Sequence, residues 1–465
     1  MLSLTARVNG ALKKLQDRTE TFFYGNFYPV IFSLITFLFW ALDMQLVGFG
    51  ILILVGSFVL IVFDDMTPII PLLFLVPMTL RNSAIFNDTL PPYLTLIVAA
   101  VALIFNVIKS PKTIKFDLIT AALICVIITF LIGGIFSPHL SDYVYGLPFL
   151  AISGIAMIAI HIFFTNKIKL NDKVDLKHYL CFSLLTAINL ACCQLVYAKV
   201  HVELFGPTVF IFPGFCWANT NHIGNLILLA VPICCYLLTR AKSIWFYAFN
   251  FIFLYFCVFL SKSDGATATL IALTPIVILE SHLKVSRKNH LPLKIFWLVV
   301  CSLAVLFLAY MFLFQKQALI EYWETSSDDS GRIPLYESAI ELIKQFPVFG
   351  VGLGHGTLVA GEVHKGYFHS TFFHVAACTG FVGVASYVFL YFARIKGILK
   401  GRSDLGLFTF IAFLMFSVYG MIENSEFNVV VIYLTVLITV TALTAKQGKE
   451  DFPLPLHKKF FNHYF

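Results

Sequence analysis

Charged residues are scarce in this chain of 465 residues: they make up 12% of the sequence, whereas hydrophobic residues make up 59%. Water-soluble domains carry roughly 25% charged residues, and their apolar residues recur in short periodic stripes. Here the apolar runs are long enough to cross the hydrocarbon core of a bilayer, which is about 30 Å thick. The scarcity of charge therefore excludes a soluble domain and indicates a polytopic membrane protein.

Other features are missing as well. No CxxC pair occurs among the ten cysteines, and Cys216 alone falls in a loop predicted to lie outside, so neither a cysteine metal site nor a disulfide framework is expected. The sequence has no internal repeat and no low-complexity tract. The first 26 residues lack a small-residue cleavage site before a short apolar core, so we interpret them as a cytoplasmic segment before the first span.

What the sequence does contain is a long series of apolar segments. Their lengths predict an all-α membrane protein with about 12–14 transmembrane helices. The range 27–63 is either two helices or one long tilted helix plus a short one, and 67–80 is short enough to re-enter the membrane. The predicted segments are 27–46, 47–63, 67–80, 92–108, 116–135, 143–165, 178–198, 222–239, 244–261, 265–283, 295–314, 372–393, 407–422 and 428–443.

Lysine and arginine set the predicted orientation. Most of the 32 fall in alternate connections, 394–402 among them, which we place on the cytoplasmic side together with both termini. Basic cytoplasmic loops that face anionic lipid then explain the net charge of +7, so nucleic-acid binding is not needed to account for it. The predicted parts are a cytoplasmic segment 1–26, a transmembrane bundle 27–314, an outer catalytic loop 315–371, C-terminal transmembrane helices 372–443 and a cytoplasmic tail 444–465.

The long outer loop contains DDSGRIPLYESAIELIKQFPVFGVGLGHG, from Asp328 to Gly356. Asp328 and its neighbours can cap a helix, and Pro334 suits the first turn. An apolar stripe follows at helical spacing: Ile333, Tyr336, Ile340 and Ile343. We expect a short amphipathic helix at the outer interface, ended by Pro347 and the glycines after it. The run GVGLGHG resembles a phosphate-binding loop, but no strand precedes it, so we interpret it as a helix stop and a hinge.

Two further stretches on the predicted outer side carry polar residues at span ends. In GFCWANTNHIGN (214–225), Asn219, Asn221 and His222 face a helix N-terminus, where an anion binds or an asparagine simply caps the helix. In SKSDGA (261–266), Lys262 either meets a phosphate or pairs with Asp264 in a tight polar turn.

Arg332 is one of two arginines that we place outside. Its guanidinium can hold two phosphate oxygens, and the alternative is a pair with Glu337 or Asp328 on a solvated face.

Histidines follow in YFHSTFFH (367–374), where His369 lies at the membrane border and His374 one to two turns deeper. A histidine can take a proton from a hydroxyl or hold a phosphate, and at an interface it is often only structural. Glu423, in the last outer turn, is a secondary candidate for a base or an exposed turn carboxylate.

These stretches resemble the O-antigen ligase and polysaccharide polymerase superfamily. GRIPLYESAIELIKQFPVFGVGLGHG is similar to the family's Gly-Arg, short helix and Pro followed by Gly-x-Gly, and HSTFFHVAACTGFVGVASYVFLYF to its His-Ser and glycine-bearing span. GFCWANTNHIGNLILLAVP is similar to its asparagine-rich span entry. The matches cover roughly 212–392. The resemblance implies a GT-C-like membrane glycosyltransferase that moves a glycan from a polyprenyl (undecaprenyl) diphosphate carrier to an acceptor hydroxyl on the outer face.

The resemblance also implies roles for the candidate residues. Arg332, supported by Lys262, would stabilise the departing diphosphate, and His369 would activate or orient the acceptor hydroxyl. No metal and no cofactor is implied, and the partners are the lipid-linked donor, a glycan or lipid-borne acceptor and the bilayer. Glu423 completes the catalytic candidates, and the candidates for binding the diphosphate or the glycan are Lys262, Arg81, Asn219, Asn221, His222, His355 and His374.

The chain departs from the family pattern at one place. Where members often carry Ser-Arg-Gly, it has Ser263, Asp264 and Gly265. Either Lys262 substitutes for the arginine, or Arg332 and Arg81 hold the diphosphate, or the donor or the activity differs.

A second class of function is a transporter or flippase for a lipid-linked saccharide. Transporters usually carry charges near the bilayer midplane and repeated halves, and the sequence shows no repeat. The residues leave open whether the chain is a ligase or a polymerase, because both use the same donor chemistry.

Overall fold

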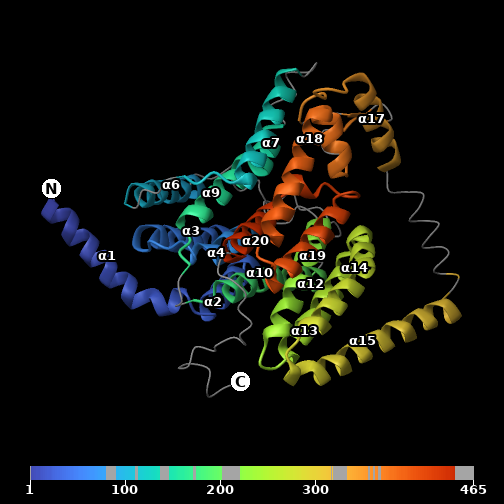
Figure 1. Cartoon of the computed structure of the whole chain (residues 1–465), viewed down its shortest axis with the longest axis horizontal. Helices are drawn as coiled ribbons and strands as arrows, with labels where there is room; N and C mark the ends of the chain where they lie inside the picture. Colours follow the sequence, from blue (N-terminus) through green and yellow to red (C-terminus); the bar gives the residue numbers. More distant parts are fainter. Residues whose placement is uncertain are drawn as a thin grey trace.

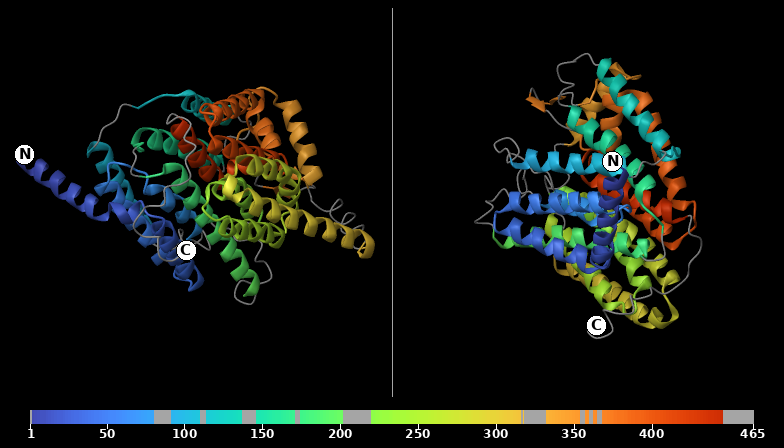
Figure 2. Two further views of the ribbon diagram at one scale, coloured as in Figure 1. Left: turned by 60° about the horizontal axis from the view of Figure 1, so that its bottom comes forward. Right: turned by 90° about the vertical axis from the view of Figure 1, so that its left-hand side faces the viewer.

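The structure is a computed structural model that describes residues 2–79, 91–109, 114–136, 146–170, 174–201, 220–315, 317, 332–353, 357–359, 362–364 and 368–445. It is a bundle of helices with one short antiparallel hairpin, and α1 and α15 project from opposite sides of the bundle (Figures 1 and 2).

The elements of the first half, in chain order, are α1 (Leu2–Phe23), α2 (Phe27–Ala41), α3 (Gln45–Val62), α4 (Ile69–Leu75), the 3₁₀ turn η1 (Val76–Met78), α6 (Pro91–Lys109), α7 (Leu118–Ile135), α8 (Leu147–Leu150), the π-helical turn η3 (Ala151–Ala156), α9 (Met157–Lys167) and α10 (Leu176–Val200). Those of the second half are α12 (Thr220–Arg240), α13 (Trp245–Ser261), α14 (Asp264–Lys284), α15 (Arg287–Phe314), α17 (Arg332–Gln345), β1 (Thr357–Val359), β2 (Glu362–His364), α18 (Thr371–Leu399), α19 (Asp404–Tyr419), the 3₁₀ turn η4 (Ser425–Phe427) and α20 (Val430–Thr444).

In its described residues, each predicted apolar segment is mainly helical, and the prediction of an all-α polytopic membrane protein is confirmed. Within the described ranges seven helices are long and apolar enough to cross a membrane by themselves, and six apolar helices are shorter. The N-terminal segment is itself helical: α1 from Gly10 onward meets α2 at 77°. The hairpin β1–β2 is a small addition to the predicted helices.

The core of the bundle is α12. All residues in the most apolar stretch of α12 are buried, whereas only 22% of the residues in the most apolar stretch of α15 are buried. A helix that is apolar all round belongs inside a bundle, and α10, α13, α14 and α19 pack around α12. The large exposed apolar side chains of α15, such as Leu298 and Leu306, lie on its outward surface, as expected of a helix that faces lipid. The N-terminal end of α12 is therefore held firmly between several helices.

α18 is broken at Gly380, whose φ of 63° and ψ of −163° are not helical. The segment 347–353, just after α17, fills the break. The amides of Val351 and Gly352 donate to the carbonyls of Ala377 and Cys378, at 3.0 and 2.9 Å, and two amides beyond the break donate back to this segment. α17 ends before the glycines, as predicted. The amides of Gly350 and Gly352 donate to the carbonyls of Phe346 and Cys378.

The two parts of α18 fold toward one another at this break. His374 in the first part and Tyr387 in the second both lie against Phe427 of η4, with ring centroids 4.6 and 6.0 Å away. In a straight helix the α carbons of these two residues would be about 20 Å apart, too far for both rings to reach one phenylalanine. The break therefore bends α18, and η4 packs between its two parts.

One correction concerns Arg394, which we placed in a cytoplasmic connection. It lies within α18, is 2% exposed, and donates to both carboxylate oxygens of Glu426, at 2.5 and 3.2 Å. Glu426 is fully buried, and its carbonyl accepts a hydrogen bond from Ser153 of η3 at 2.6 Å. The basic run after Tyr391 thus begins inside the bundle, because a carboxylate is available there to pair with the guanidinium.

Candidate functional site

The carboxylate of Glu423 gathers donors from three other parts of the chain. Oε1 lies 3.0 Å from Nδ1 of His369 and accepts the backbone amide of Asn424 at 3.2 Å. Oε2 accepts the side-chain amide of Asn221 at 2.9 Å and lies 3.5 Å from Nη2 of Arg332. The side chain of Glu423 is 3% exposed, against 29% for Arg332 and 35% for His369. A buried anion is thus flanked by two more exposed basic groups.

The surroundings of Glu423 favour its ionised form. Burial by itself raises the pKa of the carboxyl group. The hydrogen bond and charge of His369, the amide of Asn424 and the charge of Arg332 act in the opposite direction and prevail, so the pKa lies below its ordinary value of 4.5. Glu423 therefore carries a negative charge at neutral pH, and the prediction of an exposed turn carboxylate is wrong because the turn folds back onto α12 and α18.

His369 stands immediately before α18 in a left-handed backbone conformation, with a φ of 46°. A residue with a Cβ adopts this conformation at a cost, so neighbouring contacts must hold it there. Ser370 caps α18 by accepting the amide of Phe373, and Thr371 donates its amide to the carbonyl of Gly420 at 2.8 Å. The cap and this bond fix the end of α18 against the turn that carries Glu423.

Arg332 is the first residue of α17, and the prediction of a short helix in this segment is confirmed. Tyr336, one turn further, donates its hydroxyl to the carbonyl of His369 at 3.2 Å and stacks on Phe373 with ring centroids 4.7 Å apart. Ile333 and Ile340 of the predicted apolar stripe are exposed. The face of α17 that bears Arg332 and Tyr336 is the one that meets the site.

A chain of polar groups joins the site to the elbow between α13 and α14. The hydroxyl of Tyr419 donates to the carbonyl of Asn221 at 3.3 Å and lies 3.2 Å from the hydroxyl of Ser263. Lys262, beside it, caps α13 with a φ of 55° and has an exposed side chain. The buried member of the elbow is thus Ser263, while Lys262 faces outward from it.

The remaining candidates lie further from the carboxylate or outside the described residues. His222 is buried in α12, within electrostatic range of Glu423 and His369. His374 is buried between Phe368 and Phe427, one turn into α18. Three predicted binding residues lie outside the described ranges: Arg81, Asn219 and His355. In the part of the chain that the structure describes, no group of three His, Cys, Asp or Glu side chains could hold a metal ion.

Sequence reasoning missed Tyr336, Tyr419 and Asn424 as parts of this site. Tyr336 was visible only as a member of the apolar stripe of α17. Tyr419 is the last residue of an apolar helix and carries no pattern that marks its hydroxyl as a partner of Asn221.

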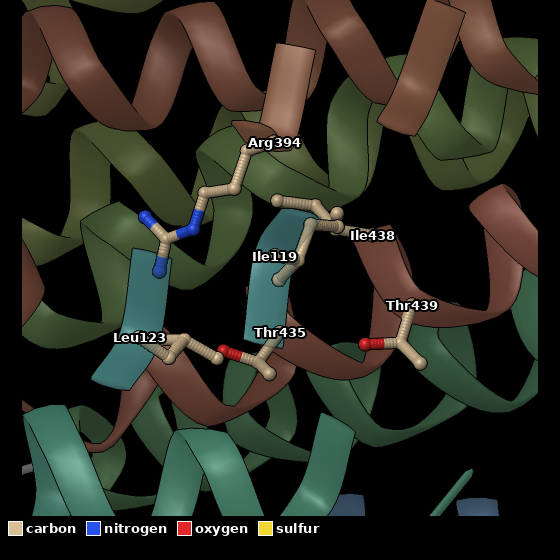
Figure 3. Close-up of a pocket in the computed structure, with 6 residues that line it drawn as sticks. All are labelled: Ile119, Leu123, Arg394, Thr435, Ile438 and Thr439. Atoms are coloured by element: carbon tan, nitrogen blue, oxygen red, sulfur yellow. The ribbon is translucent and has the colours of Figure 1, made fainter. Parts of the chain in front are cut away.

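A separate polar cluster lies inside the bundle. Beside Arg394, a small cavity is lined by residues of α7 and α20, with Thr435 and Thr439 providing polar atoms (Figure 3). The hydroxyl of Thr439 is 2.8 Å from Nδ1 of His161, whose Nε2 is 3.0 Å from the N-cap carboxylate of α7, Asp117. This cluster runs from the buried His161 to the exposed carboxylate of Asp117 and is separate from the site around His369.

Comparison with known proteins links part of the chain to one family. Residues 248–388 match a family model described as O-antigen ligase. The matched segment contains Lys262, Arg332, His369 and His374, and ends before Glu423. No curated protein matches the chain.

Proposed function

Since residues 248–388 match a family model described as O-antigen ligase, we propose that the protein is a membrane glycosyltransferase. It transfers a glycan from a polyprenyl diphosphate carrier to an acceptor hydroxyl, on the outer face of the membrane and with inversion. The observation that carries the proposal is the joining of Arg332, His369 and Glu423 in one partly exposed site from separate segments of the chain.

Arg332 has the chemistry needed for the donor. The bond that breaks joins the anomeric carbon to a diphosphate oxygen, and negative charge develops on the diphosphate as it leaves. A guanidinium can bind two phosphate oxygens at once, and fixed cations stabilise such charge strongly in a site shielded from water. The side chain is exposed enough to exchange its 3.5 Å contact with Glu423 for a phosphate. Lys262 supplies a second cation from the elbow.

His369 and Glu423 have the chemistry needed for the acceptor. With Nδ1 facing the carboxylate, the proton on the neutral ring resides at Nδ1 and the basic lone pair at Nε2. Nε2 takes the proton of the acceptor hydroxyl while the oxygen attacks the anomeric carbon, and Glu423 stabilises the imidazolium that forms. One such displacement inverts the anomeric centre, and the bonding electrons leave with the diphosphate.

The test uses purified protein with a lipid-linked donor and an acceptor. Arg332→Ala and His369→Ala should each lower transfer about 10²–10³-fold, the usual loss for one group that stabilises developing charge. Lys344→Ala, in the same helix as Arg332 but exposed at its other end, and His290→Ala, in α15, are matched controls that should keep normal rates. Full activity in both site variants would overturn the proposal.

A flippase remains the second candidate, and one observation favours it. The ion pair of Arg394 and Glu426 is buried among the helices, where transporters place the charges of a transport path. A flippase would move the lipid-linked donor across vesicle membranes in the absence of any acceptor, and Arg332→Ala would leave this movement intact. Transfer that requires Arg332, without such movement, supports the enzyme.

A further inference from the structure

α17 is only partly buried against the rest of the protein. Ala339 is its one buried residue, and Ile333 is 63% exposed. The helix meets the site through Arg332 and Tyr336, which are four residues apart and therefore lie on the same face, one above the other. Arg332 reaches the carboxylate of Glu423, and Tyr336 reaches the main chain of His369. One helix thus contacts both members of the pair between Glu423 and His369.

The contact with His369 is made to a backbone that needs support. The carbonyl that accepts the hydroxyl of Tyr336 belongs to the residue with a φ of 46°. Rotation about the N–Cα bond of His369 would move this carbonyl and the imidazole together, away from Glu423, because both are attached to the same α carbon. Burial raises the pKa of Tyr336, so the hydroxyl remains a donor at neutral pH. The stacking of its ring on Phe373 fixes the direction of that donor.

We propose that Tyr336 is a positioning residue, which holds the left-handed backbone of His369 so that Nδ1 of the imidazole meets Glu423. Because Arg332 and Tyr336 lie on the same helix, the position of α17 determines both where the guanidinium of Arg332 lies and how the imidazole of His369 is oriented. This inference rests on the proposed function. It adds a role for a residue that touches neither the carboxylate nor the imidazole ring.

The test compares Tyr336→Phe with wild type in the purified full-length protein. The substitution keeps the ring that stacks on Phe373 and removes one hydrogen bond, so kcat should fall roughly 3–10-fold while KM for the donor stays the same. Tyr310→Phe, in α15, is the matched control and should change neither. Tyr336→Ala also removes the stacking and loosens Arg332, so KM for the donor should rise as well.

A double-mutant cycle separates positioning from a general structural role. If Tyr336 acts through His369, adding Tyr336→Phe to His369→Ala should not lower the residual rate further. Full additivity, or a normal kcat in Tyr336→Phe, would overturn the inference. Retained activity in His369→Ala and Arg332→Ala would instead overturn the proposed function, so the two failures are distinguishable. Thermal unfolding in detergent, expected to be normal for Tyr336→Phe, checks that the fold is intact.

Discussion

The α carbon of Gly380 lies against the backbone of Val348, so close that a Cβ at position 380 would overlap the carbonyl of Val348. Gly350, on the opposing segment, approaches Cys378 in the same way. Both glycines have positive φ values, of 63° and 68°. The break in α18 and the segment after α17 therefore form one joint, which neither residue could make with a side chain.

Alanine at this joint should destabilise the protein. Gly380→Ala combines a strained backbone conformation, which costs on the order of 1–3 kcal/mol, with a direct overlap, so the loss should reach or exceed that range. Gly10→Ala is the matched control, because a Cβ there meets nothing within 4 Å. Replacing a glycine in a helix by alanine stabilises by up to about 1 kcal/mol. Thermal unfolding in detergent measures both variants. Equal melting temperatures for Gly380→Ala and Gly10→Ala would contradict the close packing of Gly380 against Val348.

Removing either member of the buried ion pair should be costly. Arg394→Met or Glu426→Met alone leaves a buried charge without its partner, and such changes cost about 3–5 kcal/mol. The double variant leaves no charge, so it should recover most of the loss. Unfolding midpoints of the two single variants and the double variant provide the measurement. Losses that simply add would show that the two side chains do not depend on one another.

The lowered pKa of Glu423 predicts a pH dependence of stability. The pKa is below 4.5 in the folded protein, so the carboxylate stabilises the fold above the pKa of the unfolded chain, and this contribution is lost as the pH falls through the folded pKa. At pH 7 Glu423→Gln should lose about 1.5–3 kcal/mol, the range for a hydrogen bond to a charged group. The difference from wild type should shrink as the pH drops below about 4.5. A constant difference from pH 7 to pH 3 would contradict the assigned ionisation.

Asn221 offers a test of the charge at the centre of the site. Asn221→Asp would place a second carboxylate within about 3 Å of Glu423, and two such groups cannot both ionise easily. One of them should then hold a proton near neutral pH and compete with His369 for Glu423. Transfer should fall more than in Asn221→Ala, which removes the donor without adding a charge. A pH–rate profile of both variants measures the effect, and identical profiles would contradict it.

The sequence was sufficient to predict most of the helices and several residues of the candidate site. Long apolar runs mark spans, and the polar stretch around Arg332 predicted α17 because capping residues and helical spacing are local signals. The grouping of Arg332 with His369 followed from their positions at span ends, whereas Glu423 was only a secondary candidate.

The contacts that tertiary packing decides could not be predicted. Asn221 and Glu423 are 202 residues apart, and no local pattern pairs them. Arg394 belongs to a basic run that looks like a loop, because the sequence does not show which carboxylate will be buried beside it. Gly380 looked like an ordinary glycine of a span, since its φ depends on the segment that packs against it.

The ion pair inside the bundle also bears on how the protein is made. Arg394 precedes Glu426 by 32 residues, so the ribosome adds the carboxylate roughly 2–6 s after the guanidinium, at about 5–20 residues per second. During that interval α18 would carry an arginine without its partner near its C-terminal end, where the cost is below the roughly 2.5–3.5 kcal/mol of an arginine at the centre of a spanning helix. α18 and α19 are therefore expected to leave the translocon as one helical hairpin, with α18 retained until Glu426 has emerged.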